Sequence, residues 1–192
     1  MSEPGSEPLE DTLVVPFAER LLDCLCIELG RSLGGAVCQC CLRPGMVPAP
    51  MDACYCNCPD GNAGQASVQV TDVFPSSKFP RNQIDVWDEA CAVGVTWVAE
   101  LTMTVYRCVS AIDGEGRPPT CEQLERDFRV IQSDAAAMRR AFACCSDWAL
   151  EQQTRPGGWK PIGPIGACGG GFMSVLVDVG GLCCPPDEPD LP

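Results

Sequence analysis

Cysteine is the residue type in this 192-residue chain with the most chemistry to offer, because 16 cysteines occur together with no histidine. The densest cluster lies between residues 36 and 64, where Cys38-Gln-Cys-Cys is followed by Cys54-Tyr-Cys-Asn-Cys. Side chains at alternate positions of an extended chain point to one side, so Cys38 and Cys40 could face Cys56 and Cys58 across two hairpin-like arms. That arrangement favours disulfides. We expect disulfides to be drawn from Cys38, Cys40, Cys41, Cys54, Cys56, Cys58, Cys91, Cys108, Cys168, Cys183 and Cys184.

A zinc site is the alternative use of the same cluster. Cys38 and Cys41 form a CxxC pair, and Cys56 with Cys58 could complete four thiolate ligands. The second pair has CxC spacing, which is tighter and less usual for zinc, so disulfides are favoured and we expect neither a metal nor another cofactor. Free thiols are a third state. A thioredoxin-like redox site is disfavoured, because Pro44-Gly45 follows the CxxC where a helix would begin.

Catalytic chemistry finds little support. Without histidine, the usual general base for a serine or cysteine nucleophile is absent, and no carboxylate pair lies in a recognisable motif. Arg139-Arg140 could bind an anion, although a solvated or salt-bridged face is the ordinary interpretation of such a pair. We therefore expect a protein that is not an enzyme.

The charge of the chain is strongly negative but unevenly placed. The net charge is −13, from 13 basic and 26 acidic residues. Seven acidic residues lie near the ends, and subtracting them leaves −6 for the rest of the chain. An acidic surface repels a phosphate backbone, so a basic DNA-binding patch is disfavoured. These seven are Glu3, Glu7, Glu10, Asp11, Asp187, Glu188 and Asp190.

The cysteine content conflicts with the expected place of synthesis. The chain has no apolar run near the roughly 20 residues that cross a bilayer, and its acidic N-terminus is unlike a signal peptide. Synthesis in a cytoplasm is therefore expected, yet structural disulfides persist in secreted proteins and on virions. One resolution is a protein that is made in a reducing cell and works outside it.

The elements that must position these residues centre on residues 93–148. Apolar residues alternate from Val95 to Tyr106, which predicts a strand with one buried face. Thr120 stands three residues before Gln123, as in a capping box at the start of a helix. The following apolar stripe is expected to lie on the sheet, and it comprises Leu124, Phe128, Ile131, Ala135, Met138, Phe142 and Cys145.

Further elements surround this unit. A helix is predicted from Pro16 to about Leu33, ended by Gly34-Gly35, with Cys24 and Cys26 on different faces as small buried hydrophobes. Strands are predicted at 65–74 and 172–179, and 159–171 as a proline-glycine connector of low intrinsic order. The fold class is α+β, with a small mixed or antiparallel sheet, two helices packed on it and cysteine-rich loops.

One domain is expected, covering residues 13–180 between a disordered acidic arm at 1–12 and an acidic proline-rich tail at 181–192. It contains the cysteine-rich loop 36–64 and an extended loop at 75–92. A loop of that length is usually functional or mobile. If it reaches outward, Phe79, Ile84 and Trp87 are candidate contacts for a partner chain, and packing onto the core is the alternative.

A family resemblance rests on three segments. The long strand ends in Val105-Tyr-Arg-Cys-Val, the long helix contains Asp134-Ala-Ala-Ala-Met-Arg-Arg-Ala-Phe, and Pro164-Ile-Gly-Ala-Cys-Gly-Gly-Gly-Phe leads into the last strand. In this order, the segments resemble a cysteine-rich family of siphophages that infect actinobacteria, which we interpret as tail terminator (tail completion) proteins. The likeness spans about residues 15 to 180. The 75–92 loop and the Cys-Cys-Pro-Pro tail depart from the pattern.

The resemblance implies a structural virion protein at the head-tail junction, assembled in the host cytoplasm. Six copies would form a ring that caps the tail tube, between the tube protein below and the head-tail connector protein above. The sheet would line or abut a channel through which DNA passes without specific binding, and no membrane would be involved. The cysteines would be reduced during assembly and oxidised after lysis.

Two alternatives from other classes remain. Another neck protein, such as a connector, stopper or adaptor, would share these features, although a stopper is expected to be mostly β and the long helix speaks against that. A zinc-binding protein-interaction module is the other.

Overall fold

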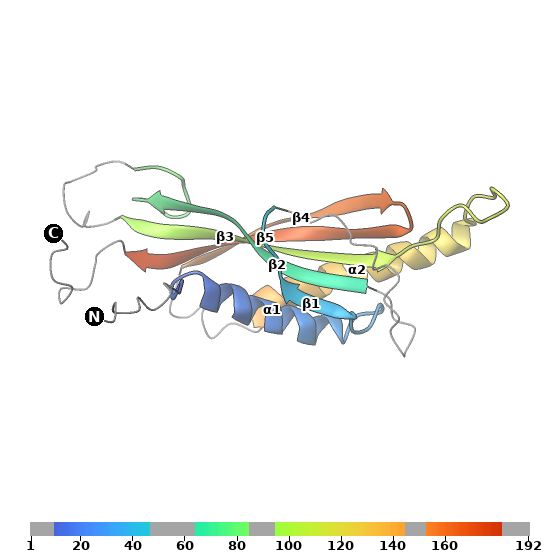
Figure 1. The fold of residues 1–192 in the computed structure, drawn as a ribbon, viewed down its shortest axis with the longest axis horizontal. Helices are drawn as coiled ribbons and strands as arrows, with labels where there is room; N and C mark the ends of the chain where they lie inside the picture. Colours follow the sequence, from blue (N-terminus) through green and yellow to red (C-terminus); the bar gives the residue numbers. More distant parts are fainter. Residues whose placement is uncertain (1–9, 47–63, 85–94, 145–152, 182–192) are drawn as a thin grey trace, which may run out of the picture.

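The computed structural model describes residues 10–46, 64–84, 95–144 and 153–181. Neighbouring strands form one five-stranded sheet in the order β1-β2-β3-β5-β4, in which β1 is parallel to β2 and the other pairs are antiparallel. The fold is thus α+β with a mixed sheet and two helices, as the sequence predicts (Figure 1). No helix in these ranges is long and apolar enough to cross a membrane. The elements are α1 (Val15–Leu29), β1 (Gln39–Leu42), β2 (Gly64–Ser76), β3 (Thr96–Cys108), α2 (Cys121–Cys144), β4 (Thr154–Ile165) and β5 (Cys168–Gly181).

The core lies between the two helices and one face of the sheet. Leu21, Leu25 and Leu29 recur every four residues on α1 and are fully buried, and Met138 of α2 is buried beside them. Burial of each such side chain stabilises the fold by about 1.5–3 kcal/mol. The sheet contributes alternate residues of its three central strands, among them Ala66, Val68, Leu101, Met103, Val105, Met173, Val175 and Val177.

The opposite face of the central strands carries a polar layer. Gln69 Nε2 donates to Ser67 Oγ at 2.6 Å, and Thr104 Oγ1 donates to Gln69 Oε1 at 3.0 Å. All three residues are at most 4% exposed. Because buried polar groups must be hydrogen-bonded to avoid a large desolvation cost, this layer fixes the side chains of β2 and β3 relative to each other.

The first helix begins as predicted but ends earlier. Asp11 Oδ1 accepts hydrogen bonds from the amides of Leu13 and Val14, both at 2.8 Å, ahead of the proline in the first turn. The predicted extension to about Leu33 is wrong, because α1 ends at Leu29 and the chain continues in turns to Gly35, which has a positive φ of 66°. Glycine adopts that conformation without steric cost.

The second helix begins with the predicted capping box. Gln123 Oε1 accepts from the Thr120 amide at 2.8 Å, and Thr120 Oγ1 accepts from the Gln123 amide at 3.3 Å. The predicted apolar stripe packs on the sheet only in its second half, where Met138 is buried, whereas Leu124 is 51% and Phe128 63% exposed. The start of α2 extends past the end of the sheet (Figure 1). Cys145, at the end of the predicted stripe, lies outside the described residues.

The predicted connector at 159–171 is wrong. These residues belong to β4, to a turn at Gly166 and to β5, which pair as an antiparallel hairpin. The prolines of β4 are tolerated because β4 is an edge strand, whose outward amides need no partner. The cysteine-rich segment likewise contains the short strand β1, which pairs with Gln65–Val68 of β2.

Candidate functional site

Two of the three segments of the family resemblance meet at a buried ion pair between β3 and α2. Arg107 Nε donates to Asp134 Oδ2 at 2.8 Å and Arg107 Nη2 to Asp134 Oδ1 at 3.0 Å, and the two side chains are 3% and 5% exposed. Two parallel hydrogen bonds of this kind give the pair both strength and a fixed geometry. Arg107 therefore ties the end of β3 to the middle of α2.

The same arginine holds the turn after α1. Arg107 donates to the carbonyl oxygen of Gly34 at 3.0 Å and to that of Gly35 at 2.7 Å. Ser32 Oγ donates to Asp134 Oδ1 at 2.7 Å. A Cβ atom on Gly34 would lie 2.7 Å from the guanidinium, so only glycine leaves room for it. The network satisfies a buried charge and joins three elements, which is a structural role.

The glycine-rich third segment lies against the same strand end. Gly170 pairs with Tyr106 in the β3–β5 ladder, and a Cβ atom on Gly170 would overlap the carbonyl oxygen of Val105. A Cβ atom on Gly171 would lie 2.5 Å from the Trp159 indole. The glycines thus allow β5 to approach β3 and Trp159 of β4 to pack across the hairpin.

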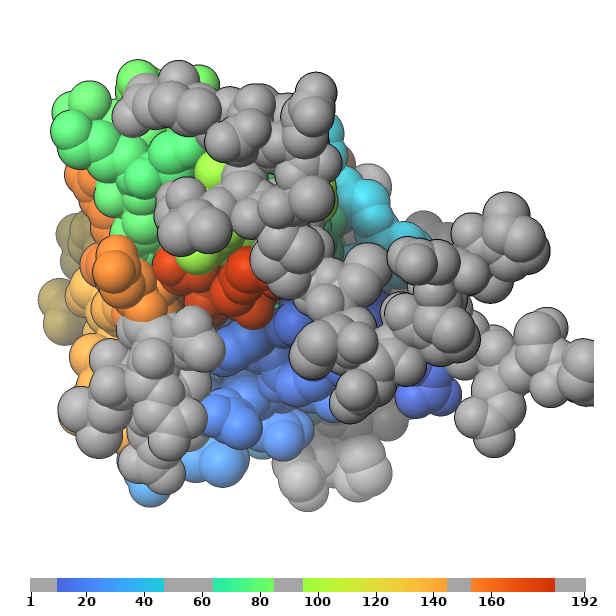
Figure 2. All heavy atoms as spheres, turned by 90° about the vertical axis from the view of Figure 1, so that its left-hand side faces the viewer, coloured from blue at the N-terminus to red at the C-terminus, as the bar shows by residue number. Residues whose placement is uncertain are grey.

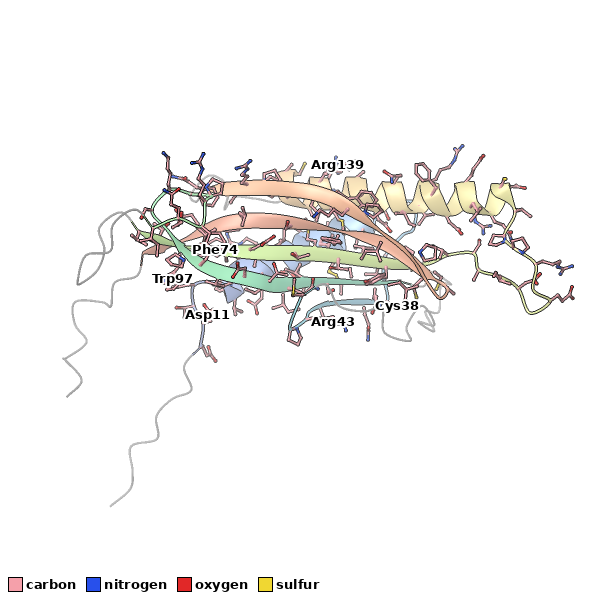
Figure 3. The ribbon with its side chains drawn as sticks, turned by 90° about the horizontal axis from the view of Figure 1, so that it is seen from above. Asp11, Cys38, Arg43, Phe74, Trp97 and Arg139 are labelled. Carbon is pink, nitrogen blue, oxygen red and sulfur yellow. A yellow bond between two sulfur atoms is a disulfide. The ribbon has the colours of Figure 1, made fainter. Side chains whose placement is uncertain are left out.

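The two neighbouring arginines of α2, Arg139 and Arg140, have different interactions. Arg140 Nε donates to Glu28 Oε2 of α1 at 2.7 Å, and Arg31 donates to Glu28 Oε1 at 2.6 Å, whereas Arg139 is exposed (Figure 3). The hydrogen bond from Arg140 lowers the pKa of Glu28 most, and the charges of Arg140 and Arg31 lower it further, against desolvation by burial. Arg140 is therefore engaged in a salt bridge between the helices, so the pair does not form a joint anion site.

Disulfides are present, but not in the pairing suggested by alternation. Cys40 of β1 is bonded to Cys26 of α1, where α1 and β1 run side by side and the two Cα atoms are 6.2 Å apart. A bond from Cys40 to Cys56 or Cys58 is therefore ruled out, because Cys40 is bonded to a cysteine of the helix that packs against β1. Cys24 is disulfide-bonded as well, so neither cysteine of α1 is only a buried hydrophobe.

The other predicted disulfide cysteines have mixed outcomes. Cys38 and Cys168 are disulfide-bonded, as predicted, whereas Cys41 is a free, exposed thiol, so that prediction is wrong. Cys41 points away because adjacent strand residues face opposite sides. Cys108 lies opposite Cys168 in the β3–β5 ladder. Outside the described residues lie Cys54, Cys56, Cys58, Cys91, Cys183 and Cys184.

The zinc alternative is contradicted at one of its four ligands. A cysteine in a disulfide has no thiolate to offer, and Cys38 is in a disulfide. Within the described ranges, no group of three or more cysteine, aspartate or glutamate side chains is placed to hold a metal ion.

The loop proposed for partner contact is described only in part. Pro75 and Ser76 still belong to β2, and a tight turn follows in which the Arg81 amide donates to the Lys78 carbonyl oxygen at 2.9 Å. Phe79 is half-buried within this turn, and Ile84 is 40% exposed. Trp87 lies outside the described residues.

An apolar groove lies between the first half of α2 and β4, and we call it the α2–β4 groove. Its volume is about 350 Å³. One wall of the groove is formed by the apolar stripe that the sequence predicts on the helix. The other wall is formed by β4, which the sequence analysis predicts as a connector. Its apolar lining includes Leu124, Phe128 and Ile131 of α2 with Trp159, Pro161 and Ile162 of β4.

A second hollow of about 410 Å³ lies at the other end of the sheet. Apolar side chains, including Val73, Trp97 and Val179, line it together with Glu10 and Asp11. Figure 2 faces this end of the molecule, with the start of α1 in blue and β5 in red. Asp11 accepts the two amides that precede α1, so it serves the helix start.

No model of a known protein family matches the chain, and no curated protein sequence matches it.

Proposed function

We propose that the protein is a structural subunit of a siphophage virion, a tail terminator at the head-tail junction without enzymatic activity. Six copies form a ring that caps the tail tube. The tube protein binds below and the head-tail connector protein above, and DNA passes through without specific binding. The subunit is assembled in the host cytoplasm and remains in the virion.

The observation that carries this proposal is the convergence of the three resembling segments. They are distant in sequence, yet Arg107 of the first is paired with Asp134 of the second, and Gly169 of the third lies opposite Arg107 in the β3–β5 ladder. If the resemblance reflects a common fold, the matching residues are expected to lie near one another in the structure. If it arose by chance, they would have no reason to be neighbours. The resemblance is thus supported as one of fold-determining residues.

The edges of the sheet are built so that one subunit does not extend the sheet of the next by strand pairing. Each sheet edge is protected: β1 has four residues, β2 is irregular between Val70 and Asp72, and β4 contains Pro156, Pro161 and Pro164. Short strands, bulges and prolines are the usual means of preventing edge-to-edge growth. Subunits are then expected to meet through side chains, which limits assembly to defined contacts.

The disulfide supports a working place outside the reducing cell. A bond such as Cys26–Cys40 persists in an oxidising environment and is rare in a cytoplasm. A virion component that is made in the cytoplasm and released at lysis meets both conditions.

The native mass of the purified protein tests the proposal. Six copies by native mass spectrometry, and a ring by electron microscopy, would support a terminator. Tube protein of the same virus should stop elongating when the purified ring is added. A stable monomer that leaves tube length unchanged would contradict the proposal.

A further inference from the structure

The α2–β4 groove is an apolar surface that the described part of the chain leaves exposed. On one wall, Leu124 and Phe128 are 51% and 63% exposed. The other wall contains Trp159 and Pro161 of β4. Grooves lined by aromatic side chains bind proline-rich segments in the polyproline II conformation, which is already extended and therefore loses little entropy on binding. The lining favours an occupant of this kind.

The sequence provides a proline-rich segment after β5. Residues 185–192 contain four prolines, at 185, 186, 189 and 192, and three acidic residues between them. We call this stretch the 185–192 segment, and it lies outside the described residues. Proline fixes φ near −65°, so a sequence of this composition favours the polyproline II conformation.

The charge at the rim of the groove suits an acidic occupant. Arg126 Nη2 donates to Ser110 Oγ at 3.5 Å, and Ser110 lines the groove. Arg126 is 69% exposed and its ion pair with Asp127 spans 3.7 Å, so its guanidinium has donors left for an incoming carboxylate. Asp127 also lines the groove, but its carboxylate accepts a hydrogen bond from the Ser110 amide at 2.6 Å, which compensates part of its charge.

The 185–192 segment cannot lie along the groove of its own chain. β5 runs from its hairpin with β4, beside the groove, to Gly181 at the far end of the sheet (Figure 1). From Gly170, which lines the groove, to Gly181 is about 36 Å at about 3.3 Å per residue. Pro185 and Pro189 reach at most about 14 Å and 29 Å beyond Gly181, even in a fully extended chain. A segment that fills the groove must therefore come from another copy.

We propose that the 185–192 segment of one copy binds the α2–β4 groove of the next copy. Its prolines pack on Phe128 and Trp159, and its acidic residues lie at Arg126. The contact is heterologous, because each copy offers the segment from one end of its sheet and the groove at the other. Such a contact repeats around an axis and can close into a ring whose two faces differ. The inference assigns a contact between copies, so it goes beyond the proposed function and does not require it.

The test uses two variants of the full chain. Pro185→Ala/Pro186→Ala/Pro189→Ala alters the segment and keeps the groove, whereas Phe128→Glu blocks the groove and keeps the segment. Each variant alone should associate at least about tenfold more weakly than the wild type, as expected for residues at the centre of an interface. An equimolar mixture should form one-to-one dimers, because it contains only one intact pairing of groove and segment. Native mass spectrometry, with one variant labelled with heavy nitrogen, identifies these dimers.

Matched controls separate this contact from general effects of charge. Ile27→Glu should leave association unchanged, because Ile27 is 56% exposed on α1 and does not line the groove. A fluorescent peptide of residues 185–192 should bind the triple proline variant, and adding Arg126→Glu should weaken binding by about two- to fivefold. Arg139→Glu is the control on the same helix, since Arg139 is exposed and does not line the groove. Circular dichroism confirms that each variant is folded.

The outcomes distinguish this contact from the ring itself. A hexamer that the triple proline variant leaves intact would overturn the contact and leave the ring standing. Equal binding of the peptide to chains with and without Phe128→Glu would overturn the groove as its site. Mixed dimers from a wild type that forms no hexamer would support the contact and contradict the ring. A mixture that stays monomeric would overturn the exchange of segments between copies.

Discussion

Arg107 and Asp134 show what a single buried contact contributes to this fold. Replacing Arg107 with Met leaves the Asp134 carboxylate buried with Ser32 as its remaining hydrogen-bond donor in the network. We expect the free energy of unfolding to fall by about 3–5 kcal/mol, the usual cost of an uncompensated buried charge. Urea denaturation followed by circular dichroism measures the change.

Two further variants make the Arg107 prediction specific. Arg126→Met serves as a control, since Arg126 is 69% exposed and its ion pair with Asp127 spans 3.7 Å, and it should cost less than about 1 kcal/mol. Arg107→Met/Asp134→Leu removes both charges and should recover much of the loss. Equal effects of Arg107→Met and Arg126→Met would contradict a central role for the buried pair.

Glu28 predicts how stability responds to acid. Its pKa in the folded protein lies below the ordinary value of 4.5 for a glutamate, because Arg140 and Arg31 favour the carboxylate. A lowered pKa contributes stability above the unfolded value, and this contribution is lost as the pH falls through the folded pKa. Glu28→Gln should therefore be less stable than the wild type at pH 7, and the difference should shrink below pH 4.5. Thermal unfolding across this range, with exposed Glu19→Gln on the same helix as the control, checks it. A difference independent of pH would refute the assignment.

At the scale of elements, the β3–β5 ladder depends on the absence of a side chain at Gly170. Gly170→Ala places a methyl group on the carbonyl oxygen of Val105, so the two strands must separate. We expect destabilisation of about 3 kcal/mol or more, at the upper end of overpacking effects, because a backbone atom is displaced. Gly163→Ala on β4 meets nothing within 4 Å and should cost little. Denaturation midpoints compare the two variants, and similar values would contradict the close approach.

Long uniform periodicities made most elements predictable. The alternation of Val95–Tyr106 predicts β3, and the capping box with a period of three to four predicts α2, because each signal is local. The strand β4 could not be predicted in this way. Its prolines and glycines indicate a loop locally, and it is a strand only because β5 provides a hydrogen-bonding partner.

The site was less predictable than the elements. The Cys26–Cys40 bond depends on where α1 packs relative to β1, which no spacing of cysteines reveals. Arg107 lies in a strand of otherwise ordinary alternation, and its partner is 27 residues away on a helix. The exposed half of the α2 stripe could not be recognised either, because a helical period does not indicate where the sheet ends.

For the whole molecule, the Cys26–Cys40 bond limits the freedom of the unfolded chain. It joins residues 14 apart in sequence, and closing a loop of that size is expected to contribute about 3 kcal/mol. Cys26→Ala/Cys40→Ala should lower the free energy of unfolding by about this amount under oxidising conditions. Cys41→Ser, which removes a free exposed thiol, is the control. Guanidinium denaturation without reductant measures both, and unchanged stability of the double variant would mean that the bond does not constrain the unfolded state.

The disulfide between α1 and β1 also determines whether proteolysis between them separates the chain into fragments. Arg31 is 64% exposed and lies between the two bonded cysteines, within reach of trypsin. A molecule severed there keeps its fragments linked through sulfur, so it should migrate as one band on a denaturing gel until a thiol reagent is added. For the proposed virion subunit, this means that one cut by a protease outside the host would not release a fragment.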